Sequence, residues 1–120
     1  SLAPARPRLG GRVVTTLVRG RVYRARPSGF DQDTFFVVVS NNSRNRKLDS
    51  VLVVRFTTSA KPLLPSIVEI PSTEVLPGGR VVCDDIYDLY SDEVNADIGA
   101  LSAQTMDAVN DGLKAALSLP

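Results

Sequence analysis

The stretch TFFVVVSNNSRNRKLDSVLVVRFTT, residues 34–58, consists of two apolar runs separated by a polar and basic segment. Both runs are rich in Val and Phe, residue types that favour β-strands. Residues 41–43, Asn-Asn-Ser, stand between the runs, and such residues favour turns. The pattern therefore predicts two neighbouring strands at 34–41 and 50–58, joined by a short polar connection.

The rest of the chain divides in the same way into short strands separated by breaks rich in Pro and Gly. The breaks lie at 27–29, 61–62 and 77–79. We expect the remaining strands at 20–26, 65–70 and 80–86. The β-prone residues 12–18 add a further strand or lengthen the first one.

A helix is predicted near the end of the chain, because Ser102 suits an N-cap and apolar residues then recur at helical spacing. Those residues are Met106, Val109, Leu113 and Ala116 or Leu117. Gly112 lies inside this helix and weakens it by roughly 1 kcal/mol relative to Ala, so burial of the apolar stripe must compensate. Residues 91–93, Ser-Asp-Glu, are expected to form a short helical turn.

Length and composition indicate one compact domain. A chain of 120 residues with 43% hydrophobic content suffices for one core and is too short for two. We expect an N-terminal extension at 1–18, partly disordered or forming the extra strand, and a domain at 19–120. No apolar run approaches the roughly 20 residues of a membrane span, and no apolar secretory segment is present near the N-terminus.

Cysteine and histidine content limit the chemistry. Cys83 is the single cysteine and there is no His, so the chain has neither an internal disulfide nor a Cys/His metal set. We therefore expect no metal site of this kind, no cofactor, and a reducing cytoplasm as the location.

Charge is distributed unevenly along the chain. Residues 1–61 carry twelve Lys and Arg against three Asp and Glu, whereas residues 62–120 carry two against ten. This asymmetry is typical of a basic face that neutralises phosphates. The alternative is that the two halves fold together and their charges offset one another as ordinary solvated surface.

Several segments resemble the MazF/PemK toxin family, in the family's order. Residues 34–58 resemble its central hairpin: an apolar strand, a polar residue followed by Asn-Asn, an Asn-Arg pair at Asn45-Arg46, and a strand closing on Thr-Thr. The other matching segments are 19–23, 65–70, 81–86 and 99–102 with Met106. The resemblance covers residues 19–119, and six weak matches in the right order are hard to obtain by accident.

This resemblance implies a mainly β (α+β) fold: a small SH3-like antiparallel barrel with a C-terminal helix, as in MazF and CcdB. It also implies a growth-inhibiting toxin of a bacterial toxin–antitoxin pair. The implied activity is metal-independent cleavage of single-stranded RNA by attack of the ribose 2′-hydroxyl. The implied partners are a second copy of the chain in a homodimer and an acidic antitoxin protein.

The resemblance assigns the family's catalytic Thr to Thr57, while Thr34 stands where the family usually carries an Arg that cuts RNA. Strand alternation puts Phe56 in the core and therefore turns Arg55 and Thr57 outward on one face. Arg55 is then the cation closest to Thr57 along the strand. The alternative reading is structural: Thr57 as a β-former at a strand end and Arg55 as a solvated rim charge.

Asp84 matches a position where the PemK/Kid branch of the family uses an Asp. The Arg expected two residues before it is Val82, and the Arg expected three residues after it is Tyr87. Asp84, Asp85 and Asp88 could alternatively suggest a Mg²⁺ site. Adjacent strand residues point to opposite faces, however, which argues against a shared ion unless the strand has ended.

Basic residues flank the first two predicted strands and could line a groove for single-stranded RNA. Phe30 or Phe35 would offer a surface for base stacking, with Phe30, in a loop, the better candidate. The alternative is that the arginines form the water-facing side of a strand and both rings belong to the core. The expected RNA-binding residues are Arg19, Arg21, Arg24, Arg26, Phe30, Asn41, Asn42, Arg44, Arg46 and Lys47.

A non-catalytic function on the same barrel is the alternative to cleavage. The protein would then bind RNA without cutting it, or poison a protein target as CcdB toxins do. CcdB toxins reach gyrase through a C-terminal Trp-Gly-Ile. This chain has no Trp and ends Leu-Ser-Leu-Pro, which counts against gyrase as the target.

Overall fold

The computed structural model describes residues 16–120, and its strands form one six-stranded antiparallel sheet. The sheet order is β4-β5-β3-β2-β1-β6, and every neighbouring pair is antiparallel. The elements are β1 (Arg21–Ala25), β2 (Thr34–Val38), α1 (Asn42–Lys47), β3 (Ser50–Thr57), β4 (Ile67–Ile70), β5 (Gly79–Tyr90), η1 (Ser91–Glu93), β6 (Val94–Ala100) and α2 (Ala103–Leu117). The fold is mainly β with one long helix, as predicted.

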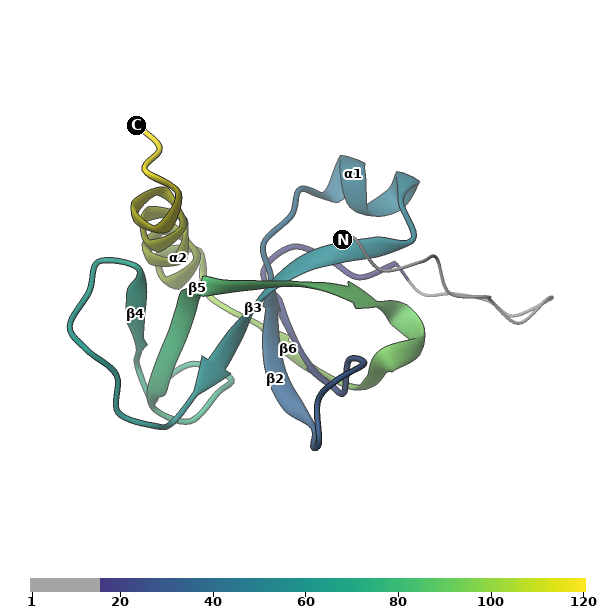
Figure 1. Cartoon of the computed structure of the whole chain (residues 1–120), viewed down its shortest axis with the longest axis horizontal. Helices are drawn as coiled ribbons and strands as arrows, with labels where there is room; N and C mark the ends of the chain where they lie inside the picture. The colour runs from purple at the N-terminus through teal and green to yellow at the C-terminus, as the bar shows by residue number, and fades with distance from the viewer. Residues whose placement is uncertain (1–15) are drawn as a thin grey trace, which may run out of the picture.

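The sheet buries both of its faces, which explains the unbroken apolar runs in the sequence. Alternate residues of β3 serve two cores: Val54 and Phe56 belong to the core beneath α2, and Val51 and Val53 to the core on the other face. Figure 1 shows α2 beside β4 and the first half of β5. β2, β1 and β6 follow β3 on the other side of the sheet, away from β4.

Four predicted strands and the terminal helix are confirmed. β1, β2, β3 and β4 lie within the predicted ranges, and the 91–93 turn is the 3-10 helix η1. Ser102 caps α2, since its hydroxyl accepts a hydrogen bond from the Thr105 backbone N–H at 3.2 Å. Of the predicted strand at 12–18, residues 12–15 lie outside the described residues, and 16–18 are not in a strand.

The connection between β2 and β3 differs from the prediction, because it contains the helix α1 rather than a simple turn. The Asn41 side chain caps this helix by accepting from the Arg44 N–H at 2.8 Å. Buried Asn45 then fixes it to the sheet: its Oδ1 accepts from the Ser40 hydroxyl at 2.6 Å, and its amide donates to the Ser40 carbonyl at 3.0 Å. Asparagine thus starts a helix here instead of marking only a turn.

Two strand predictions fall short at the C-terminal side. β5 continues to Tyr90 instead of ending at residue 86, and β6 was not predicted. The acidic residues of β5 read as a strand end, although the strand continues through Leu89 into the second core. β6 has the sequence VNADIGA, poor in β-formers, and it exists because it pairs along β1.

Gly112 brings α2 against the sheet. A Cβ at this position would lie 2.6 Å from Val68 Cγ2 and 2.8 Å from Cys83 Sγ, closer than real contacts allow. The helix-weakening glycine is therefore needed for close approach of the helix to the strands. Figure 1 shows this helix at the end of the molecule that contains β4.

We expect Gly112→Ala to lower the free energy of unfolding. The gain in helix propensity is about 1 kcal/mol, whereas overpacking of a well-packed core costs about 1–3 kcal/mol. The net loss should appear as a lower midpoint in thermal melts. Ala108→Gly, at an exposed position of the same helix, is the matched control for propensity alone. A higher midpoint for Gly112→Ala would show that Val68 and Cys83 move aside without cost.

Candidate functional site

The end of β3 turns two polar side chains away from α2. Phe56 is 5% exposed and packs in the core beneath α2, so the alternation of the strand points Arg55 and Thr57 to the opposite face. Both are half-buried. This confirms the predicted inward orientation of Phe56 and the shared face of the two polar residues.

Thr57 keeps a hydroxyl proton for a ligand. Its oxygen accepts a hydrogen bond from the Ser59 backbone N–H at 3.1 Å. A hydroxyl has one proton to donate, and no acceptor for that proton is present among residues 16–120. Thr57 can therefore donate to an oxygen that approaches this face.

Arg55 is held by an acidic partner from β5. Its Nη2 and Nε donate to Asp85 Oδ2 at 2.7 and 3.1 Å, and both side chains are partly buried. Asp85 lies in a bulge, since Val54 pairs with Ile86 while the next residue, Arg55, pairs with Val82. The bulge brings the Asp85 carboxylate to the Arg55 guanidinium, and the negative charge of Asp85 offsets part of the positive charge of Arg55.

Arg80 is the basic residue in direct register with Thr57, although it is not among the site residues predicted from the sequence. Thr57 pairs with Arg80 across β3 and β5, and Arg80 pairs with Glu69 across β5 and β4. Residues opposite one another in antiparallel strands share a face. Thr57, Arg80 and Glu69 thus form one row across three strands, which we call the Thr57 row. Local sequence patterns do not show which strands pair, so this row becomes visible only from the pairing of β3 with β5.

Thr34 lies at the same end of the sheet. β2 pairs Phe36 with Arg55, so continuing this register by two residues brings Thr34 level with Thr57. The Thr34 side chain is half-buried, and its hydroxyl donates to the Gln32 carbonyl at 3.5 Å. The predicted site residues Thr34, Arg55 and Thr57 are therefore neighbours by strand register.

Asp84 lies in the β5 bulge beside Asp85 but has a different partner. Its carboxylate accepts a hydrogen bond from the Ser66 hydroxyl at 2.7 Å, and the residue is exposed. Asp85 instead contacts Arg55, so the two carboxylates do not converge. Within residues 16–120 no group of three or more His, Cys, Asp or Glu is arranged to hold a metal ion.

The predicted RNA-binding arginines around β1 all have partners. Arg21 pairs with Asp97 at 3.0 Å, while Arg24 and Arg26 both pair with Asp33 at 3.2 and 3.1 Å. The Arg19 guanidinium donates to the Val39 carbonyl and to Asn110 Oδ1. The charges of Arg21, Arg24 and Arg26 are thus partly offset, in line with the solvated-surface alternative for these three residues, whereas the partners of Arg19 are neutral.

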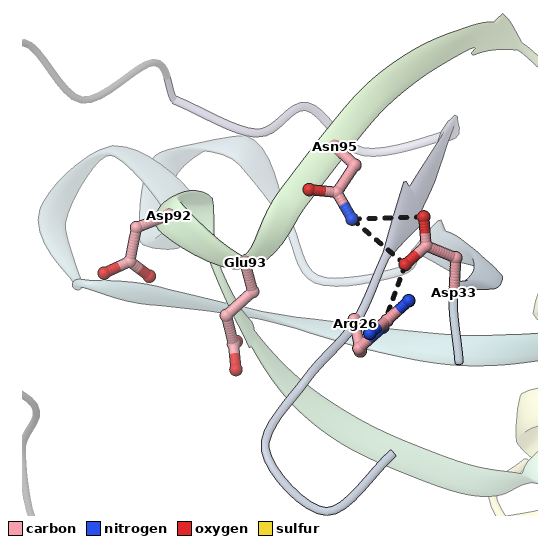
Figure 2. A pocket seen from close by; sticks show the side chains of 5 residues that line it. All are labelled: Arg26, Asp33, Asp92, Glu93 and Asn95. Carbon is pink, nitrogen blue, oxygen red and sulfur yellow. Dashed lines mark hydrogen bonds and ion pairs between the residues drawn. The ribbon is translucent and has the colours of Figure 1, made fainter. Parts of the chain in front are cut away.

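A polar cleft of about 570 Å³ lies beside Arg26. Figure 2 shows Asp33 between Arg26 and Asn95, whose amide donates to both carboxylate oxygens at 3.1 Å. Asp92 and Glu93 also line the cleft and point away from Asp33. Three of its five lining residues are acidic, so this cleft does not suit a phosphate.

Helix α1 carries the least compensated basic residues among the predicted set. Arg46 and Lys47 are exposed, and no ion pair joins either of them to another residue of the described chain. Arg44 donates to the Ser50 carbonyl at 2.9 Å, which orients it along the same helix. Asn41 caps the helix, and Asn42 Oδ1 accepts from the Arg19 backbone N–H at 2.8 Å. Both asparagines therefore hold the backbone that presents these cations.

Phe30 belongs to an aromatic cluster. Its ring lies edge-on to Phe36 and Tyr87, with centroids 5.5 and 5.2 Å apart, and the residue is half-buried. Phe35 packs against Phe56 at 6.3 Å. Phe36 is fully buried, in agreement with the prediction that at least one of the two consecutive rings is core.

Cys83 is not available as a nucleophile. It is fully buried, and its thiol donates to the Val109 carbonyl at 3.7 Å. Burial, with a smaller contribution from the negative charge of Asp84, raises the pKa of the Cys83 thiol to about 11. The reactive thiolate is therefore scarce at neutral pH, and the side chain serves to pack α2 onto the sheet.

Comparison with known proteins identifies the class. Residues 19–117 match the model of the PemK-like, MazF-like toxins of type II toxin–antitoxin systems. Endoribonuclease MazF1 of Mycobacterium bovis and endoribonuclease MazF4 of Mycobacterium tuberculosis are each 36% identical to the chain over 103 residues, covering 86% of it and 94% of the relative. The chain belongs to this toxin family, as the sequence resemblance indicated.

Solved structures agree with that assignment. A mycobacterial endoribonuclease in complex with its cognate antitoxin superposes with a TM-score of 0.79 at 35% identity, over 87% of this chain and 97% of that one. MazF in a MazE–MazF complex from Deinococcus radiodurans has the same fold, with a TM-score of 0.72 at 18% identity over 88% of this chain and 99% of that one. Among the described residues no helix is long and apolar enough to cross a membrane.

Proposed function

We propose that this protein is a growth-inhibiting toxin that cleaves single-stranded RNA by attack of a ribose 2′-hydroxyl on the adjacent phosphate. The observation that carries the proposal is the Thr57 hydroxyl, held beside guanidinium groups on a face that α2 leaves open. The near full-length similarity to endoribonucleases of the same family supports it.

The reaction needs a group to take the 2′-hydroxyl proton, a group to protonate the leaving 5′-oxygen, and donors for the negative charge that develops on the phosphate. In this proposal Thr57 donates to a phosphate oxygen, and Arg55 stabilises the developing charge. Asp84 is exposed and accepts one hydrogen bond from Ser66, so a free lone pair remains to take the 2′-hydroxyl proton, and solvent water protonates the leaving 5′-oxygen. Thr34 occupies the position of the family's usual Arg and lines the same end of the sheet.

RNA bound at this site is proposed to extend along the hairpin of β2 and β3 to the basic surface of helix α1, which joins the opposite ends of these two strands (Figure 1). Arg46 and Lys47 are exposed there without an acidic partner among the described residues, which leaves their full charge for phosphates. The arginines around β1 and the ring of Phe30 would contribute less, since each already has a partner within the protein.

The test is incubation with a long single-stranded RNA in EDTA, followed by gel analysis and end-group analysis of the fragments. Attack by the 2′-hydroxyl breaks the bond to the 5′-oxygen, so the fragments should end in a 2′,3′-cyclic phosphate and begin with a 5′-hydroxyl. RNA that stays intact with or without added Mg²⁺ would favour the non-catalytic alternative. Cleavage that occurs only with Mg²⁺ would contradict the proposed chemistry.

A homodimer is proposed, because a small barrel gains buried apolar surface when two copies associate. Leu63 and Leu64 are 97% and 50% exposed in the loop between β3 and β4, and this apolar pair offers surface that a second copy could cover. Sedimentation equilibrium at micromolar concentration should give about twice the chain mass of 12.9 kDa. A single species at the chain mass would contradict this prediction.

An acidic, partly disordered antitoxin is proposed to cover the basic surface of α1, since a segment that folds on binding can wrap a large charged surface. A related mycobacterial endoribonuclease has been solved with its cognate antitoxin. RNA as the substrate fits a location in the bacterial cytoplasm. If a cognate acidic partner bound only the acidic C-terminal half of this chain, the model of charge complementarity would be wrong.

A further inference from the structure

Arg80 already binds an anion next to Thr57. Its Nε lies 3.1 Å from Glu69 Oε2, and its Nη1 donates to the carbonyls of Thr58 and Ser59 at 3.3 and 3.2 Å. The two carbonyls fix the guanidinium at the end of β3. Its Nη2 group has no hydrogen-bond partner among residues 16–120, so donors remain for a ligand beside Thr57, with which Arg80 is paired.

The anion bound to Arg80 is easily displaced. Glu69 lies on the edge strand β4, and its side chain is 66% exposed, whereas that of Arg80 is 27% exposed. Exposed ion pairs contribute little net stability, because water solvates the freed carboxylate and the side chain regains its conformational freedom. A phosphate could therefore replace Glu69 on the guanidinium at small cost, and arginine suits phosphate as well as carboxylate.

Arg55 differs in this respect. Its partner Asp85 is 35% exposed, and it accepts two hydrogen bonds from the guanidinium, one of them at 2.7 Å. That pair is shorter and better shielded than the pair of Arg80 with Glu69. Of the two guanidinium groups near Thr57, the one of Arg80 is the easier to transfer from its carboxylate to a ligand.

We propose that Arg80 is a phosphate-binding residue of the RNA site, that it lies beside Thr57, and that Glu69 competes with RNA for it. The proposal rests on the proposed RNA-cleaving function. It adds a positive charge that stabilises the phosphate in place of the Arg that the family usually carries at the position of Thr34. Glu69 then lowers the affinity for RNA, because a phosphate must displace this carboxylate to bind Arg80.

The experiment measures binding of a 2′-O-methyl oligoribonucleotide, which lacks the attacking hydroxyl, by fluorescence anisotropy over a series of salt concentrations. Arg80→Gln keeps donors for the Thr58 and Ser59 carbonyls but removes the charge. It should weaken binding about tenfold. It should also make the negative slope of the logarithm of the association constant against log[salt] less steep by about 0.7, the value for one phosphate contact on a single strand. Cleavage of unmodified RNA should fall in parallel.

Glu69→Gln tests the competition. Removing this carboxylate should tighten binding several-fold, and the gain should vanish when Arg80→Gln is also present. Lys114→Ala and Asp107→Asn are matched controls that remove one positive and one negative charge from exposed positions of α2. A purely structural role of Arg80 would change the melting temperature without changing the salt slope.

The outcomes distinguish failure of the role of Arg80 from failure of the RNA-cleaving function. If the wild-type protein cleaves and binds RNA while Arg80→Gln keeps the wild-type salt slope, the role of Arg80 is wrong and the RNA-cleaving function stands. A gain from Glu69→Gln that persists without Arg80 also overturns it. If Arg80→Gln fails to fold, unchanged binding by Glu69→Gln overturns the proposal. A wild-type protein that neither binds nor cleaves RNA overturns both.

Discussion

Replacing Thr57 by Ala should lower the rate of RNA cleavage on the order of 10²-fold while leaving the fold intact. Loss of one preorganised donor to the developing negative charge typically has an effect of this order. The hydroxyl is positioned for this role by the Ser59 N–H, which occupies its oxygen and leaves its proton for the phosphate. The rate of fragment formation from a long single-stranded RNA measures the effect.

Thr73→Ala is the matched control for Thr57→Ala. Thr73 is exposed in the loop between β4 and β5, so removal of its hydroxyl should change neither the cleavage rate nor the melting temperature. Thr57→Ser should retain most of the activity, because it keeps the donor and loses only the methyl group. Wild-type rates for Thr57→Ala would remove Thr57 from the proposed mechanism.

Replacing Arg55 by Ala should also reduce cleavage on the order of 10²-fold, provided that its guanidinium stabilises the transition state. Arg55→Lys should be nearly as damaging, because the point charge of an ammonium does not reproduce the planar fork by which a guanidinium binds a phosphate. Unchanged cleavage by Arg55→Ala would show that this arginine only stabilises the β5 bulge.

A variant of Asp85, the partner of Arg55, complements the Arg55 variants. In Asp85→Asn, Arg55 loses its anionic partner, so binding of RNA should tighten while the bulge is weakened. If Thr57 and Arg55 act on the same phosphate, the double mutant should lose far less activity than the product of the two single losses. Thermal melts of each variant separate loss of activity from loss of folded protein.

The sequence predicted those parts of the fold that local signals determine. Phe36 and Phe56 sit in apolar runs whose length and composition mark strands, and Ser102 marks the start of α2. Helix α1 was missed because its stability depends on contacts that only the folded chain contains, above all those of buried Asn45 with Ser40. β6 was missed for a similar reason, since its residues are poor strand formers that pair along β1.

The site was predictable only along single strands. Alternation in β3 placed Arg55 and Thr57 on one face without any knowledge of the neighbouring strands. The partner of each residue depends on how β5 pairs with β3, and a bulge changes that register between Val54 and Arg55. Asp85 as the partner of Arg55 and Arg80 as the neighbour of Thr57 therefore required the structure.

The long strand β5 connects the two cores of the molecule. Val81 and Cys83, near its start, belong to the core beneath α2, and Leu89, near its end, belongs to the core on the other face. Opening of either core would disturb the pairing of β3 with β5, because residues of both strands belong to both cores. A ligand that binds only at the Thr57 row should accordingly slow hydrogen exchange in β2 and in α2 alike, and protect the whole domain from proteases.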